Sequence, residues 1–142
     1  SPLDLYNEPS NLFVAGFIGS PKMNFINTKI SSTNSGNAEV NIMNSGNLAV
    51  SIKSSDISIG NNVTLGIRPE HLTINQQSDV IWEGNVFVIE KLGSGTFLYI
   101  EKENEPLVVA VEGDTNIKVG ERVKIGFTAN RCHLFSNKGL TL

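Results

Sequence analysis

Apolar and polar residues follow two different spacings along this chain, and the change falls near Pro21. Before Pro21, apolar residues recur four positions apart, which places them on one side of a helix. We therefore expect a helical fragment before Pro9 and a short helix over residues 12–18. After Pro21, apolar residues recur at every second position, which is typical of half-buried strands.

Short alternating segments separated by turn residues fill the rest of the chain. The expected strand segments are 25–30, 38–43, 48–52, 62–72 with a strand end at Pro69, 84–93, 96–103, 105–114, 121–129 and 131–135. The expected connections are a loop over 31–37, a hairpin turn over 44–47, a turn over 93–95 and a tail over 136–142. Many short strands with regular turns indicate an all-β barrel or sandwich, without a sustained helix after Gly19 and without a strict repeat.

Composition narrows the class of protein. The 142 residues fit one domain, and the formal net charge of −3 with scattered lysines argues against a nucleic-acid-binding protein. The single cysteine, Cys132, excludes an intramolecular disulfide and fits a reducing compartment. No apolar run approaches the roughly 20 residues that span a bilayer, and the first residues do not resemble a signal peptide. We expect a soluble, intracellular domain.

Two glycine-rich or polar segments are candidate sites. The stretch LGSGTF, residues 92–97, offers backbone amides but has no lysine and no following helix, so a hairpin turn is favoured over a phosphate loop. The cluster RPEH, made of Arg68, Pro69, Glu70 and His71, could bind an anion or shuttle a proton. Because no nucleophile or metal cluster accompanies it, we expect a structural or interface role, with Arg68 and Glu70 pairing to fix the loop.

Three further side chains have a structural and a functional interpretation. Cys132 and His133 would point to opposite faces of a strand, and with His71 they supply too few converging ligands for zinc, so we expect Cys132 to be a small buried residue. Trp82 either anchors a partner or a sugar ring, or lies half-buried in a barrel wall; we favour the wall.

Four ordered motifs make a family recognisable. They are SPLDLYNEPSNLFVAGFIGSPKMNF (1–25), LGIRPEHL (65–72), EGNVFVIEKLGSGT (83–96) and RCHLF (131–135). Together they resemble the ATP-binding subunits of ABC sugar importers of the maltose/maltodextrin type, and the resemblance extends over essentially the whole chain. It implies a C-terminal regulatory domain of the transport-associated OB (TOBE) type, all-β, with OB-like β-barrel subdomains and a short N-terminal helical segment.

The resemblance also implies a division of labour. Residues 1–8 would be the tail of an ATPase domain, and residues 9–142 the regulatory domain. Without Walker motifs this chain would be a non-catalytic piece of a longer subunit, with ATP and Mg²⁺ bound in the ATPase domain. The whole subunit would contact membrane permeases on the inner face of the cell membrane.

Two kinds of partner follow from the resemblance. Regulatory domains of this family hold two subunits together as a homodimer, and the maltose type docks regulators such as the glucose-specific phosphotransferase protein. The positions matching that docking surface are Phe25, Gly60, Thr64, Gly66, Gly84 and Glu90. Thr64 stands where the maltose subunit has serine, and the stretch 31–37 and the segment after Lys53 depart further from the family.

A second function class is a ligand-binding module. Related OB-like domains bind small oxyanions such as molybdate through main-chain amides and small polar side chains. This chain lacks the S-A-R-N-Q type of signature found in molybdate binders. We therefore favour the regulatory and dimerisation role.

Overall fold

The structure is a computed structural model that describes residues 22–142. The expected helices before Pro9 and over residues 12–18, and the domain boundary after residue 8, lie outside the described residues. The strands are β1 (Asn24–Asn34), β2 (Asn37–Asn41), β3 (Asn47–Ser51), β4 (Asn62–Ile67), β5 (Thr73–Ile74), β6 (Val80–Lys91), β7 (Gly95–Ile100), β8 (Leu107–Glu112), β9 (Arg122–Phe127) and β10 (His133–Ser136). Two 3-10 turns, η1 (Pro69–His71) and η2 (Ala129–Arg131), are the helical elements of this part of the chain.

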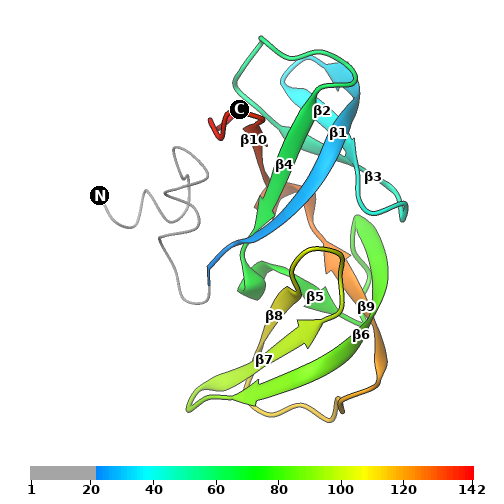
Figure 1. Cartoon of the computed structure of the whole chain (residues 1–142), viewed down its shortest axis with the longest axis vertical. Coiled ribbons are helices and arrows are strands. Elements are labelled where there is room, and N and C mark those ends of the chain that lie inside the picture. Colours follow the sequence, from blue (N-terminus) through cyan, green and yellow to red (C-terminus); the bar gives the residue numbers. More distant parts are fainter. Residues whose placement is uncertain (1–21) are drawn as a thin grey trace.

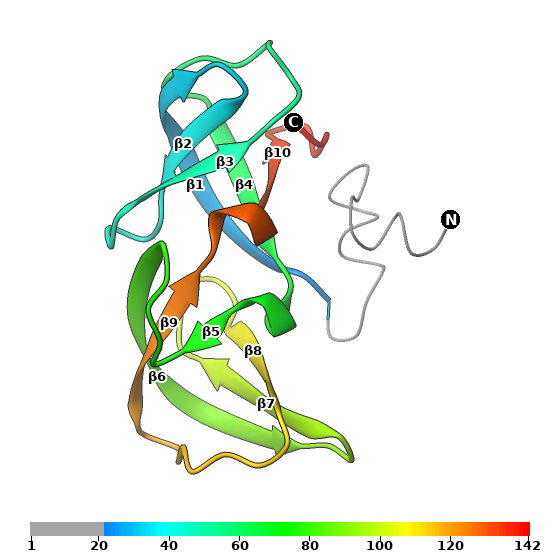
Figure 2. The same cartoon turned by 180° about the vertical axis from the view of Figure 1, so that it is seen from behind.

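The strands form two five-stranded antiparallel sheets that lie one above the other along the long axis of the molecule (Figure 1). The first sheet has the order β10-β4-β1-β2-β3, and the second has the order β5-β9-β6-β7-β8. Two strands thus leave the sheet of the strand before them: β5 follows β4 but joins the second sheet, and β10 follows β9 but joins the first. The turn η1 leads from β4 across to β5, and η2 leads from β9 back to β10, as Figure 2 shows from behind.

The two halves of the chain repeat the same connections. Gly60 precedes β4 with φ of 91°, and Gly120 precedes β9 with φ of 92°. The amide of Gly60 donates to the carbonyl of Ile30, and the amide of Gly120 donates to the carbonyl of Val86, at 2.8 and 2.7 Å. Positive φ favours glycine at both turns. The repeat is thus structural, although the sequence shows only scattered identities between the halves.

One hydrophobic core runs through both sheets. Alternate residues of the strands point inward, as the period of two predicts. In β4, for example, Val63, Leu65 and Ile67 are all under 5% exposed. The buried cluster includes residues from both halves, down to Leu134 in the last strand. The shared core and the exchanged strands β5 and β10 therefore join the two sheets, each the wall of one barrel, into one unit.

Two connections differ from the sequence prediction. The expected loop over 31–37 is mostly strand, because β1 continues to Asn34 and pairs with β2 up to Asn37. Its side chains are mostly exposed on both faces, so the stretch lacks the apolar alternation that signals a strand. The hairpin turn expected over 44–47 is centred earlier, on Met43 and Asn44, which both have positive φ.

Several other expectations are confirmed. The turn over 93–95 joins β6 and β7, and Trp82 is half-buried. Cys132 is 8% exposed and belongs to the main core cluster. The tail over 136–142 folds back on β10, with the amide of Leu142 donating to the carbonyl of Leu134 at 2.9 Å.

Candidate regulatory surface

Three of the six candidate contact positions lie together on the outer face of the first sheet. Phe25 in β1 lies opposite Gly66 in β4, and Thr64 lies two residues away on the same face of β4. On the other side of β4, His133 lies opposite Gly66, and Phe135 lies opposite Thr64. Side chains of paired residues project to the same side of a sheet, so these five positions share one face.

The lack of a side chain at Gly66 is required by a small aromatic cluster. A Cβ atom there would contact Met23 and lie 2.9 Å from a ring carbon of Phe135. The rings of Phe25 and Phe135 meet edge to face, with 6.2 Å between their centroids. Met23 and Phe135 are buried, whereas Phe25 is partly exposed. Within residues 22–142, Phe25 is therefore a partly exposed aromatic side chain of this cluster.

Thr64 borders a cleft of about 390 Å³ at the same face. The cleft is lined by uncharged residues: Asn27, Thr28, Asn62, Val63, Thr64 and Asn137. The hydroxyl of Thr64 donates to the Asn27 side-chain oxygen over a long 3.4 Å. Gly60 is exposed at the turn before β4, and a Cβ atom at this position would meet nothing within 4 Å. Gly60 thus contributes backbone but no side chain to the surface at this turn.

Gly84 and Glu90 lie on β6, a strand of the second sheet, whereas Phe25 lies on β1 of the first sheet; Figure 1 shows the two strands. Gly84 is buried, and a Cβ atom there would lie 2.9 Å from the Trp82 ring. Glu90 is exposed and accepts a hydrogen bond from the Tyr99 hydroxyl at 3.3 Å. The six positions therefore occupy two regions, and Gly84 is buried against the Trp82 ring.

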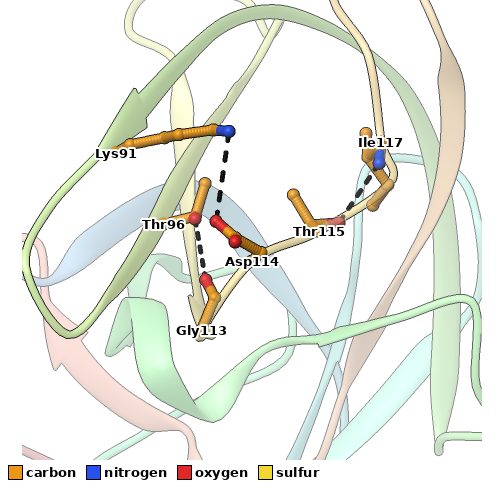
Figure 3. Close-up of polar contacts among 6 residues, drawn as sticks. All are labelled: Lys91, Thr96, Gly113, Asp114, Thr115 and Ile117. Carbon is orange, nitrogen blue, oxygen red and sulfur yellow. Dashed lines mark hydrogen bonds and ion pairs between the residues drawn. The ribbon is translucent and has the colours of Figure 1, made fainter.

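The hairpin that carries Glu90 is fastened to the connection between β8 and β9 (Figure 3). The buried hydroxyl of Thr96 donates to the carbonyl of Gly113 at 2.9 Å. Next to it, the ammonium of Lys91 lies 4.0 Å from the carboxylate of Asp114, but both side chains are largely exposed. An exposed ion pair contributes little, so the Thr96 bond is the stronger constraint.

The cluster from Arg68 to His71 lies where the chain crosses between the sheets. Arg68 is 1% exposed and Pro69 is buried, whereas Glu70 points into solvent. Burial lowers the pKa of Arg68. Burial also lowers the pKa of His71, and the positive charge of Arg131 adds to this shift. This burial supports a structural role for η1; the pairing of Arg68 with Glu70 stays a prediction.

Sequence reasoning missed the contact made by Asn24. Its side-chain amide donates to the carbonyl of Val108 at 2.8 Å, and its side-chain oxygen accepts from the amide of Val108 at 2.8 Å. Asn24 is 6% exposed at the start of β1, whereas Val108 lies in β8, the edge strand of the second sheet. The sequence signal for this contact was Asn24 itself, a polar residue at the end of SPKMN, directly where an apolar strand begins.

Residues 22–142 lack two kinds of feature. This part of the chain has no group of three or more His, Cys, Asp or Glu side chains arranged to hold a metal ion. Nor does it have a helix long and apolar enough to cross a membrane.

Burial raises the pKa of Cys132 to about 12, so its thiol stays protonated.

Known protein families account for both halves of the fold. The TOBE domain model matches residues 65–135, half of the chain. This chain belongs to the TOBE domain family. The model of the MalK OB fold domain matches residues 19–72, which include β1 to β4. The boundary between the two models falls close to η1, where the TOBE chain crosses to the second sheet.

Curated relatives are ATP-binding proteins of maltose/maltodextrin import. This TOBE chain is 40% identical over 141 residues to MalK of Aliivibrio fischeri, covering 98% of the chain and 38% of that protein. It is 41% identical to MalK of Vibrio vulnificus and 40% identical to MalK of Escherichia coli, in each case over 97% of the chain and 38% of the relative. The chain thus spans about two fifths of the length of these relatives.

A solved structure shares the fold. The molybdate-bound form of the cytoplasmic molybdate-binding protein ModG matches with a TM-score of 0.66 and 17% identity, covering 82% of this chain and 95% of that chain. At this identity the likeness concerns the fold alone.

Proposed function

We propose that this chain is the regulatory and dimerisation domain of the ATP-binding subunit of an ABC carbohydrate importer of the maltose/maltodextrin type. The observation that carries the proposal is 40% identity over 98% of the chain to a maltose/maltodextrin import ATP-binding protein. The domain itself is non-catalytic. ATP and Mg²⁺ bind to the ATPase domain of the longer subunit, which sits against permease subunits on the inner face of the membrane.

A permanent contact between two such domains has a clear physical use. Two ATPase domains that must close and reopen would diffuse apart in the open state. If their regulatory domains stay in contact, each ATPase domain remains at high effective concentration for the other. The contact surface can then be modest in area, since other subunits of the importer also hold the pair.

The outer face of the first sheet is the proposed docking surface for a regulator. Phe25 supplies a partly exposed ring, and Thr64 borders an uncharged polar cleft beside it. An aromatic anchor next to polar groups is a common composition of protein interfaces. Glu90 lies on the other sheet and would belong to a second contact region.

Titration of the labelled chain with the glucose-specific phosphotransferase protein tests the docking. Thr64→Arg places a long charged side chain in the uncharged cleft, so we expect saturable binding by the unchanged chain and loss of binding in this variant. Thr33→Arg, at an exposed threonine near the end of β1, is the matched control and should bind like the unchanged chain. Equal binding by both variants would contradict this docking surface.

Oxyanion binding is the second candidate, because the ModG protein that shares the fold was solved with molybdate bound. Calorimetry with molybdate, tungstate and sulfate distinguishes the two candidates. We expect no heat of binding from this chain, since it lacks the molybdate-binder signature. A saturable signal would favour the oxyanion-binding function instead.

A further inference from the structure

A cleft between the two halves of the molecule has no role in the proposed function. Its volume is about 410 Å³, within the range of roughly 300–1,000 Å³ that is common for small-molecule sites. Residues of β1, β6 and the two turns β2–β3 and β7–β8 line it. β1 and the turn β2–β3 belong to the first half of the fold, and β6 and the turn β7–β8 are their counterparts in the second half.

The lining of this cleft follows the internal repeat. Ile26 pairs with Leu65 in the first half, and Trp82 pairs with Ile125 in the second half, so Ile26 and Trp82 occupy equivalent places. The halves meet with an aliphatic side chain on one side of the cleft and an indole ring on the other. Only one half therefore offers an aromatic surface to a ligand.

The indole ring of Trp82 packs closely over Gly84. Gly84, two residues along the same face of β6, has no side chain, and its Cβ position would lie 2.9 and 3.0 Å from two ring carbons. Trp82 also packs against the main core cluster, yet it stays partly exposed at the cleft. A fixed aromatic face of this kind binds the apolar face of a ring at little cost in conformational entropy.

Two asparagines add hydrogen-bonding groups from equivalent turns. Asn44, in the turn β2–β3, has φ of 61°, and Asn104, in the turn β7–β8, has φ of 71°. Both line the cleft and are exposed. Within residues 22–142 neither carboxamide group makes a hydrogen bond, so each can both donate to and accept from a ligand hydroxyl. Asn27 adds a third carboxamide from β1.

The charges in the cleft balance. Lys102 and Glu103 both line it, and the Lys102 ammonium donates to the carbonyl of Glu103 at 3.1 Å. A site for an anion would carry an excess of positive charge. An aromatic face, carboxamides that match hydroxyl groups and no net charge together fit a neutral polyhydroxylated ring. We propose that this cleft binds a small carbohydrate, a mono- or disaccharide.

Trp82 is the only tryptophan of the chain and so reports directly on the cleft. The full 142-residue chain is titrated with glucose, maltose and maltotriose, followed by tryptophan fluorescence and calorimetry. We expect a saturable change with glucose or maltose at millimolar concentration. No saturable change with glucose or maltose would overturn the proposal, whatever the result with maltotriose.

Glycine variants test the two turns without disturbing them, because glycine tolerates positive φ. We expect Asn44→Gly and Asn104→Gly each to weaken binding by about 2- to 12-fold, the range for one net hydrogen bond. Asn75→Gly is the control for the backbone change, since Asn75 also has positive φ, at 55°, and lies outside the cleft, although its side-chain oxygen accepts a hydrogen bond from the amide of Lys124 at 3.0 Å. Equal affinities for all three variants and the unchanged chain would place any bound sugar elsewhere and overturn the proposal.

This test stands apart from the proposed function. A chain that dimerises but ignores sugars would retain the regulatory role and lose the carbohydrate site. A chain that binds sugars as a monomer would lose the dimerisation role and retain the site.

Discussion

The side chain of Asn24 and the backbone of Val108 form a reciprocal pair of hydrogen bonds, each 2.8 Å long, between the first strand of one sheet and the edge strand of the other. The pair covers part of the exposed edge of β8 in the way that a neighbouring strand would. It joins the two halves at the point where β1 begins.

Replacing Asn24 by alanine should lower the free energy of unfolding by about 2–3 kcal/mol, because two bonds are lost and the Val108 groups stay half-buried. Asn24→Asp should cost at least as much, since a carboxylate cannot donate to the Val108 carbonyl. Urea denaturation measures both. Asn62→Ala, at an exposed asparagine of β4, is the control and should stay within about 0.5 kcal/mol of the unchanged chain.

The exchange of β5 and β10 between the sheets predicts that the two barrels unfold together. Neither sheet keeps its five strands if the other half unfolds. Far-ultraviolet circular dichroism reports on both sheets, and Trp82 fluorescence reports on the second half. We expect the two denaturation curves to coincide, as in a two-state transition. Two separate midpoints would show that the barrels are independent.

Stability should depend on pH through His71. Its pKa in the folded chain is lowered from 6.5, mainly by burial, so the unfolded chain binds the proton more readily. The contribution of neutral His71 is therefore complete above about pH 6.5 and is lost as the pH falls toward the lower folded-state pKa. Urea denaturation between pH 5 and 8 should show a smaller loss for His71→Gln than for the unchanged chain. Parallel pH profiles would contradict the partly buried, neutral state of His71.

Much of the fold could be predicted from the sequence. Strict alternation at Val63, Leu65 and Ile67 indicated a half-buried strand, and turn residues separated the β6–β7 hairpin correctly. The stretch 31–37 was misjudged because a strand with both faces in solvent has no apolar alternation. The exchange of strands was also missed, because alternation shows which face of a strand is buried but not which sheet the strand joins.

The candidate contact positions stay a prediction, and the structure shows where each of them lies. Phe25 and Gly66 came from matching motif positions, and the structure places them opposite each other. The motifs also placed Gly84 and Glu90 in the same predicted docking surface, although these two residues lie on β6 in the other sheet. Trp82 was weighed as a barrel residue or a sugar anchor; it is half-buried in the wall and also faces a cleft. The cleft beside Trp82 is also lined by Asn44 and Asn104. These two residues are distant in sequence, so the sequence alone did not show that they line the same cleft.

Sedimentation equilibrium of the chain over a wide range of concentration tests the dimerisation role most directly. A domain that holds two ATP-binding subunits together should show a reversible monomer–dimer equilibrium, with the average mass rising from 15.4 kDa toward twice that value. A mass that stays at 15.4 kDa up to the highest concentration would contradict the proposed function.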